Sequence, residues 1–152
     1  MDTPLLQVEH LKLYYPVRSG LFGKKRFVRA VDDISLVIRK GETVGLVGES
    51  GCGKSSLGRA IVRLETPQSG KILLNGQNLL ALKGRELRKH RRNLQMIFQD
   101  PYGSLNPRLS IRSALDEVLR LHSGLDKAAR TARTEELMTM VGLDPSQLDR
   151  YP

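Results

Sequence analysis

Cysteine is nearly absent from this chain: Cys52 is the only one among the 152 residues. A single thiol excludes an internal disulfide and is typical of a protein from a reducing compartment. No apolar run approaches the roughly 18 residues that a membrane-spanning helix needs. The N-terminal residues also lack the basic region and apolar stretch of a secretory signal. These absences argue against a secreted, disulfide-rich protein and against an integral membrane protein.

Aromatic side chains make up only 5% of the chain, and acidic residues are fewer than basic ones. The 25 Lys and Arg against 16 Asp and Glu leave a net charge of +9. This excess indicates either a solvated basic surface or attraction to anions such as nucleic acid and lipid headgroups. Because so few aromatic residues offer little for base stacking, we expect no nucleic-acid partner.

The chain does contain a phosphate-loop pattern, Gly48-x-x-x-x-Gly53-Lys54-Ser55. Residues 43–47 (TVGLV) before it are mostly apolar and β-branched, which predicts a strand buried on both faces. Residues 54–64 after it place apolar side chains at helical spacing, namely Leu57, Ala60, Ile61 and Leu64. A strand, this pattern and a helix in that order indicate phosphate binding, whereas a glycine-rich turn outside that context would bind nothing.

The residue types in this loop suit a polyphosphate. Glycine at positions 48, 51 and 53 lets the main chain approach phosphate oxygens closely. The following helix adds N–H donors and a partial positive charge. Lys54 supplies an ammonium group for the β- and γ-phosphates, and Ser55 supplies a hydroxyl for Mg²⁺. We predict nucleotide binding by Gly48, Glu49, Ser50, Gly51, Cys52, Gly53, Lys54, Ser55 and Ser56.

Strand patterns surround this loop. Three are expected before it, at residues 5–13, 27–31 and 34–38. Pro16 should end the first, because proline cannot continue a ladder, and Asp32-Asp33 should separate the other two. Several strands ahead of the first helix indicate an antiparallel β layer beside the nucleotide core.

After the loop, Asn75-Gly76 is a strong hairpin signal that should join a strand at 71–74 to one at 78–81. Residues 94–98 (LQMIF) have the composition of another buried strand. Between them, residues 82–92 predict a basic helix, either solvated or part of an interaction surface.

Two further helices are expected near the C-terminus. Ser110 should cap a helix at 111–123 and Asp126 one that runs to 141. Gly124 and Gly142 should stop them. Their apolar faces are Ile111, Ala114, Leu115 and Val118 in the first helix, and Leu137, Met140 and Val141 in the second. The chain is therefore expected to be an α/β protein, with a nucleotide-binding core at 1–98 and an incomplete helical subdomain at 99–152.

One alternative for this class of loop is a GTPase. Asp100-Pro101-Tyr102-Gly103 matches a DxxG switch element that follows an apolar run. That interpretation needs a guanine-selecting Asn-Lys-x-Asp further on, and residues 104–152 contain none. A GTPase also lacks a β layer of this kind ahead of its phosphate loop.

Four stretches of the sequence resemble the ATP-binding subunit of ABC transporters, in particular the branch that energises dipeptide and oligopeptide uptake. They are HLKLYYP with Tyr15, GESGCGKSS, ETPQSGKILLNGQNL and MIFQDPYGSLNPR. The long insert between Tyr15 and Val31 is also similar to that branch. The resemblance covers nearly all of residues 5–152, and the last string is its most specific part.

The resemblance implies an ABC-type P-loop NTPase fold, with ATP and Mg²⁺ as cofactors. It implies that Tyr15 stacks on adenine, although Tyr15 could instead be an edge-strand aromatic that covers the core. Tyr14 is the neighbour with which Tyr15 could be confused. Gln99 would contact Mg²⁺ or the attacking water and sense the γ-phosphate.

The resemblance also implies partners and a location. The loop that begins at Gln99 and ends at Pro107 would meet the membrane-spanning permease subunits. A second ATP-binding subunit, identical or different, would complete the dimer, and a periplasmic or surface peptide-binding protein would take part indirectly. The subunit would then be peripheral, on the cytoplasmic face of the inner (cell) membrane.

The sequence departs from the family at its end. Family members continue with an LSGGQ-like signature, an apolar strand ending in Asp-Glu and a switch histidine, whereas these residues end at Tyr151-Pro152. No catalytic set is therefore complete, and His10, His90 and His122 are interpreted as surface residues. We expect a fragment of a longer ATPase subunit that does not hydrolyse ATP alone. The alternative is a non-catalytic nucleotide-binding fragment or adaptor.

Overall fold

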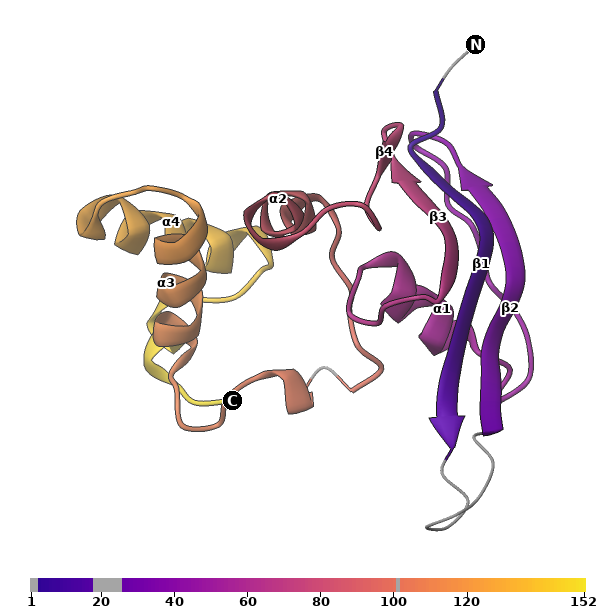
Figure 1. Ribbon diagram of the computed structural model, residues 1–152. Helices are drawn as coiled ribbons and strands as arrows, with labels where there is room; N and C mark the ends of the chain where they lie inside the picture. Colours follow the sequence, from indigo (N-terminus) through magenta and orange to yellow (C-terminus); the bar gives the residue numbers. More distant parts are fainter. Residues whose placement is uncertain (1–2, 18–25, 101) are drawn as a thin grey trace. The chain divides into compact units, whose positions relative to one another are not determined.

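The computed structural model describes residues 3–17, 26–100 and 102–152, in two compact units, Met1–Met96 and Ile97–Pro152 (Figure 1). Residues 18–25 of the insert between Tyr15 and Val31 lie outside the described residues, as does Pro101 of the DxxG element. The first unit contains β1 (Leu6–Val17), β2 (Arg26–Ile38), α1 (Lys54–Ile61), β3 (Ser69–Leu74), β4 (Gln77–Asn78), α2 (Gly84–His90) and η1 (Arg91–Asn93). The second contains η2 (Tyr102–Ser104), α3 (Ile111–His122), α4 (Lys127–Met140) and η3 (Pro145–Asp149).

The first unit is built on a four-stranded antiparallel sheet in the order β2-β1-β3-β4, which confirms the expected β layer. Buried and partly exposed residues alternate along much of β1, so one face of the sheet is apolar. Helix α1 packs on this sheet through Leu57 and Ala60 (Figure 1). The buried core is Leu6, Val8, Leu11, Leu13, Val31, Leu57, Ala60, Ile72, Leu74, Leu79 and Leu82.

The two long strands run further than their sequence patterns predicted. β2 is one strand rather than two, because Asp33 adopts a left-handed φ of 58° and forms a bulge instead of a break. His10 opposite it has a φ of 47°, and its exposed ring lies 2.9 Å from the Asp33 carboxylate. β1 likewise continues through Pro16, which pairs with Phe27. Among the residues that the structure describes, β1 has a strand neighbour on one side only at this point, and a missing N–H is tolerated there.

The hairpin at Asn75-Gly76 is confirmed, with φ of 50° and 79° at its two central residues. β4 is shorter than the expected strand at 78–81. The Asn78 side chain accepts the Leu80 N–H at 3.0 Å, and this local bond replaces a ladder bond. Helix α2 buries none of its residues, as expected for a solvated basic helix.

Two expected strands are not formed, and this corrects the predictions for residues 43–47 and 94–98. Both segments lack strand structure, and Val47 and Ile97 are 95% and 91% exposed. A strand needs a ladder partner, and in the described ranges all paired strands are β1 to β4. Helix α1 also ends early, at Ile61, since Arg63 has a left-handed φ of 61°. Leu64 is therefore 53% exposed rather than part of the apolar stripe.

In the second unit the expected caps and stops are confirmed. The Ser110 hydroxyl accepts the Ser113 N–H at 3.3 Å, and the Asp126 carboxylate accepts the Ala129 N–H at 2.8 Å. Gly124 and Gly142 follow α3 and α4 with left-handed φ of 68° and 76°.

The apolar face of α4 differs from the expected one. Met140 and Val141 are 68% and 70% exposed, whereas Thr134 and Met138 are buried. Helix η3, which brings the fully buried Leu148, packs on α4, and so does α3, so α4 is covered by two neighbours. On α3, Val118 is likewise exposed.

Ion pairs tie these helices together. Arg112 on α3 donates to both carboxylate oxygens of Asp149 at 2.7 and 3.0 Å, and Arg130 on α4 donates to Asp116 at 2.6 Å. The Arg112 guanidinium lowers the pKa of Asp149.

Candidate functional site

The phosphate loop occupies residues 48–53 and leads directly into α1. The Lys54 ammonium lies inside it and donates to the carbonyl oxygens of Gly48 and Glu49, both at 2.7 Å. It also lies 3.4 Å from the Cys52 Sγ. The loop carbonyls therefore hold the Lys54 ammonium at the start of α1.

Two of the glycines lie at close contacts, one with a backbone atom and one with a side chain. A Cβ added to Gly53, where φ is +100°, would lie 2.0 Å from the carbonyl oxygen of Ala30 in β2. A Cβ on Gly48 would lie 2.7 Å from the Cys52 Sγ. Gly51 has open space around it, but its φ of +81° favours glycine. The loop is thus a backbone cradle supported from behind by β2.

The N-terminus of α1 is open. The helix begins at Lys54, and the carbonyl of Gly53 accepts the Leu57 N–H at 2.9 Å. Unlike α3 and α4, α1 has no side chain from the described residues capping its first turn. Free N–H groups and the helix dipole together attract an anion here.

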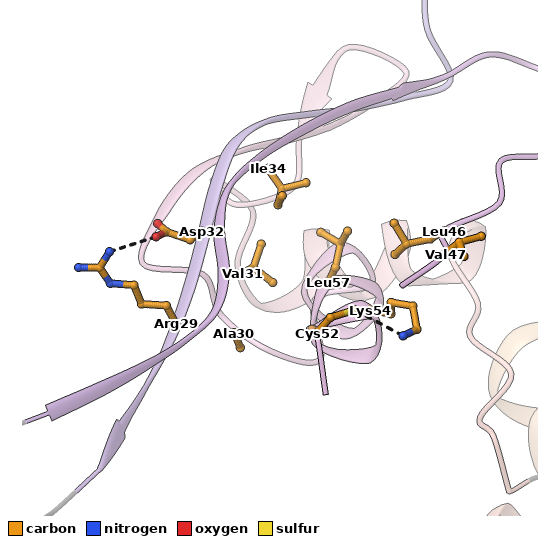
Figure 2. A pocket seen from close by; sticks show the side chains of 11 residues that line it. Arg29, Ala30, Val31, Asp32, Ile34, Leu46, Val47, Cys52, Lys54 and Leu57 are labelled. Carbon is orange, nitrogen blue, oxygen red and sulfur yellow. Dashed lines mark hydrogen bonds and ion pairs between the residues drawn. The ribbon is translucent and has the colours of Figure 1, made fainter. Parts of the chain in front are cut away.

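A pocket of about 370 Å³ adjoins the loop on its β2 side (Figure 2). It is lined by Arg29, Ala30, Val31, Asp32, Ile34, Leu46, Val47, Cys52, Gly53, Lys54 and Leu57. Figure 2 shows the Arg29–Asp32 ion pair on the other side of β2 from Leu57 and Lys54. The pocket lining is therefore mainly apolar, and Lys54 contributes a positive charge on the side of the loop.

The neighbouring tyrosines Tyr14 and Tyr15 of β1 have different surroundings. Tyr15 is half-buried and packs against the core, and it does not line the pocket. The Tyr14 hydroxyl donates to the Asp32 carboxylate, and the Arg29 guanidinium lies 5.8 Å from the Tyr14 ring centroid. The hydrogen bond raises the pKa of Tyr14 and lowers that of Asp32. The Tyr14 side chain therefore forms a surface cluster with Asp32 and Arg29.

Most of the remaining expected site residues are exposed. Ser55 lies beside Lys54 at the start of α1 with its side chain in solvent, and Ser56 is half-buried. Gln99 is exposed and belongs to the second unit. Asp100 accepts the Gly103 N–H at 3.3 Å, so its carboxylate takes part in a local turn.

A metal site of clustered side chains is absent from the described residues. In that part of the chain, no group of three or more His, Cys, Asp and Glu side chains could hold a metal ion. His10 and His122 are exposed and His90 is partly exposed. Nor does any helix in the ranges described combine the length and apolar character needed to cross a membrane.

The contribution of β2 to the site was missed from sequence. The Ala30 carbonyl that contacts Gly53 is a main-chain atom, and every residue has one. No residue type at position 30 could have indicated the contact, because it depends on how β2 passes behind the loop.

Comparison with known proteins identifies the family. The family model described as "ABC transporter" matches residues 31–151. The chain is 48% identical over 150 residues to the oligopeptide transport ATP-binding protein AppF of Bacillus subtilis (strain 168), covering 97% of this chain and 46% of AppF. It is 41% identical over 152 residues to the dipeptide transport ATP-binding protein DppF of Escherichia coli (strain K12), covering 100% of this chain and 46% of DppF.

The fold agrees with the match to the ABC transporter family model. The chain superimposes on MJ0796, a bacterial ABC transporter cassette solved as a dimer, with a TM-score of 0.77, 24% identity and coverage of 97% of this chain and 61% of that one. The chain spans about half the length of the curated relatives it matches. The chain belongs to the ABC transporter family.

Proposed function

We propose that this chain binds MgATP through residues 48–56 as part of the energy-coupling subunit of an ABC-type peptide importer. The observation that carries the proposal is the Lys54 ammonium held between the Gly48 and Glu49 carbonyls at the uncapped start of α1. An ammonium group, backbone amides and a helix N-terminus form a positive cradle of the size of a phosphate chain. The names of the relatives AppF and DppF support peptide transport.

Each residue in the site has a separate task. Lys54 would leave the loop carbonyls for the β- and γ-phosphate oxygens, and the first-turn N–H groups of α1 would donate to the same phosphates. Ser55 and Gln99 offer the hydroxyl and carboxamide oxygens that Mg²⁺ accepts as ligands. Mg²⁺, when bound, neutralises charge on the phosphates. Tyr15 offers an aromatic face to adenine.

Membership of the family suggests the domain roles, partners and location of the subunit. Residues 1–98 would form the nucleotide-binding core and residues 99–152 the start of a helical subdomain. The loop from Gln99 to Pro107 would contact the permease subunits, and a second ATP-binding subunit would close over the nucleotide. The subunit would then be peripheral, at the cytoplasmic face of the membrane, with the peptide-binding protein as an indirect partner.

The 152 residues contain no run of four apolar residues followed directly by an Asp-Glu pair that could orient the attacking water. We therefore expect the chain to bind ATP without turning it over. The complete subunit would be an ATPase.

Calorimetric titration with MgATP tests the proposal. We expect saturable heat from the folded chain, with matched Lys54→Met as the control that loses the ammonium group. Phosphate release by the chain alone should stay at background. Binding that is absent from the folded wild-type chain would overturn the proposed function, and steady turnover would contradict the expected lack of hydrolysis.

A further inference from the structure

Gln68 makes an unusual contact with the first of the two tyrosines. Its side-chain Nε2 donates to the Tyr14 carbonyl oxygen at 2.8 Å, and its Oε1 accepts the Tyr14 N–H at 2.7 Å. A carboxamide carries the same donor and acceptor as a peptide group, so the side chain imitates a strand residue. The double contact also fixes the orientation of the amide, because the Tyr14 N–H can meet only the oxygen.

This contact occurs where β1 loses a strand neighbour. The register of β1 with β3 ends at Lys12 and Ser69, and the Gln68 N–H donates to the Lys12 carbonyl at 2.9 Å. Pro67 comes next and has no N–H to donate, so the main chain cannot continue the ladder towards Tyr14. The Gln68 side chain supplies the missing rung.

The position of Gln68 is itself determined by the sheet. A Cβ on Gly70, two residues further on, would lie 2.6 Å from the Glu9 carbonyl oxygen and 2.7 Å from the Leu11 Cα. β3 therefore lies close against the β1 backbone at this point. The anchor of the Gln68 side chain is rigid although the side chain is exposed.

The carbonyl held by Gln68 belongs to the peptide unit that joins Tyr14 to Tyr15. Because that unit is planar, fixing its carbonyl also fixes the direction in which the chain enters Tyr15. On the opposite side Tyr15 pairs with Val28 of β2. We infer that Gln68 is a positioning residue for Tyr15 and thereby sets the contribution of the base to nucleotide affinity, an inference that rests on the proposed function.

The experiment compares two ligands on the 152-residue chain. MgATP carries the base, and magnesium tripolyphosphate carries the phosphate chain alone. Gln68→Ala should weaken MgATP binding by about three- to tenfold and leave tripolyphosphate binding unchanged. Tyr15→Ala should weaken MgATP binding by about five- to a hundredfold. The double variant should be no weaker than Tyr15→Ala, since both changes remove one contact.

Two variants keep the test decisive. Gln68→Glu has the same shape and can accept the Tyr14 N–H, but its carboxylate cannot donate to the carbonyl, so it should lose MgATP affinity as well. Gln77→Ala, an exposed glutamine in β4 of the same sheet, should change neither affinity. Circular dichroism would establish that each variant is folded.

The outcomes separate the two levels of the proposal. Equal losses for both ligands would show a general structural role and overturn the inference. Unchanged MgATP binding in both Gln68 variants, with a loss in Tyr15→Ala, would overturn it while the proposed function stands. No binding of either ligand by the wild-type chain would overturn the proposed function, and with it the role of Gln68.

Discussion

Replacing Gly53 by alanine should disable the phosphate loop by two separate effects. The residue has a φ of +100°, and its missing Cβ would lie 2.0 Å from the Ala30 carbonyl oxygen. Alanine must therefore adopt a conformation that L side chains disfavour, and it must also push β2 or the loop aside. The β2 strand cannot shift by itself to relieve the contact, because Val31, next to Ala30, belongs to the buried core.

The magnitude follows from adding the two costs. A left-handed backbone costs about 1–2 kcal/mol for a residue with a Cβ. A methyl group forced into a packed contact costs about 1–3 kcal/mol more. The cradle conformation should therefore lose about 2–5 kcal/mol, and MgATP affinity should fall by about 30-fold to over a thousandfold if the loop must recover that geometry to bind.

Two glycines provide matched controls. Gly41 has a φ of +77° with open space around it, so Gly41→Ala isolates the backbone cost. Gly45 has open space and no positive φ, so Gly45→Ala should be nearly neutral. The assay is calorimetric MgATP titration combined with thermal unfolding. Wild-type affinity and unfolding temperature in Gly53→Ala would refute the conclusion that β2 supports the loop.

Three other predictions address the lysine, the helical core and an ion pair. Lys54→Met should lower MgATP affinity by at least about tenfold, since charge-assisted bonds are lost; an unchanged dissociation constant in calorimetry would contradict the site. Met138→Ala should reduce the free energy of unfolding of the second unit by about 2–5 kcal/mol. Met140→Ala, at an exposed position, should change that free energy by no more than about 0.5 kcal/mol. Equal effects of the two substitutions in denaturant unfolding would show that the buried face assigned to α4 is wrong. The folded-state pKa of Asp149 is lowered by Arg112, so this carboxylate stabilises the fold above its unfolded pKa of about 3.9, and the stabilisation is lost as the pH falls through the folded pKa. The stability difference between wild type and Asp149→Asn should therefore shrink as the pH falls below the unfolded pKa, and a difference that is independent of pH throughout the acid range would exclude the pair as its cause.

Much of the local structure could be predicted because its causes lie within a few residues along the chain. Ser110 and Asp126 cap helices because their oxygens reach N–H groups three residues ahead. Asn75 and Gly76 make a hairpin because both tolerate positive φ. The phosphate loop was recognisable for the same reason, since its glycines, lysine and serine lie in one short segment.

The tertiary structure decided what depends on a partner far away in the sequence. Residues 43–47 have the composition of a buried strand, yet Val47 is exposed because a ladder needs a second strand beside it. Met138 rather than Met140 is buried, and α4 has two packing neighbours, α3 and η3, whose positions depend on the fold.

The same distinction applies to the candidate site. Residue types and spacing alone determined where the chain can hold a phosphate chain, because backbone access and charge are local properties. The support of Gly53 by the Ala30 carbonyl, and the bond of Gln68 to Tyr14 across 54 positions, needed the folded sheet. Contacts made through main-chain atoms cannot be predicted from residue types, because every residue carries those atoms. Only the fold brings a particular pair together.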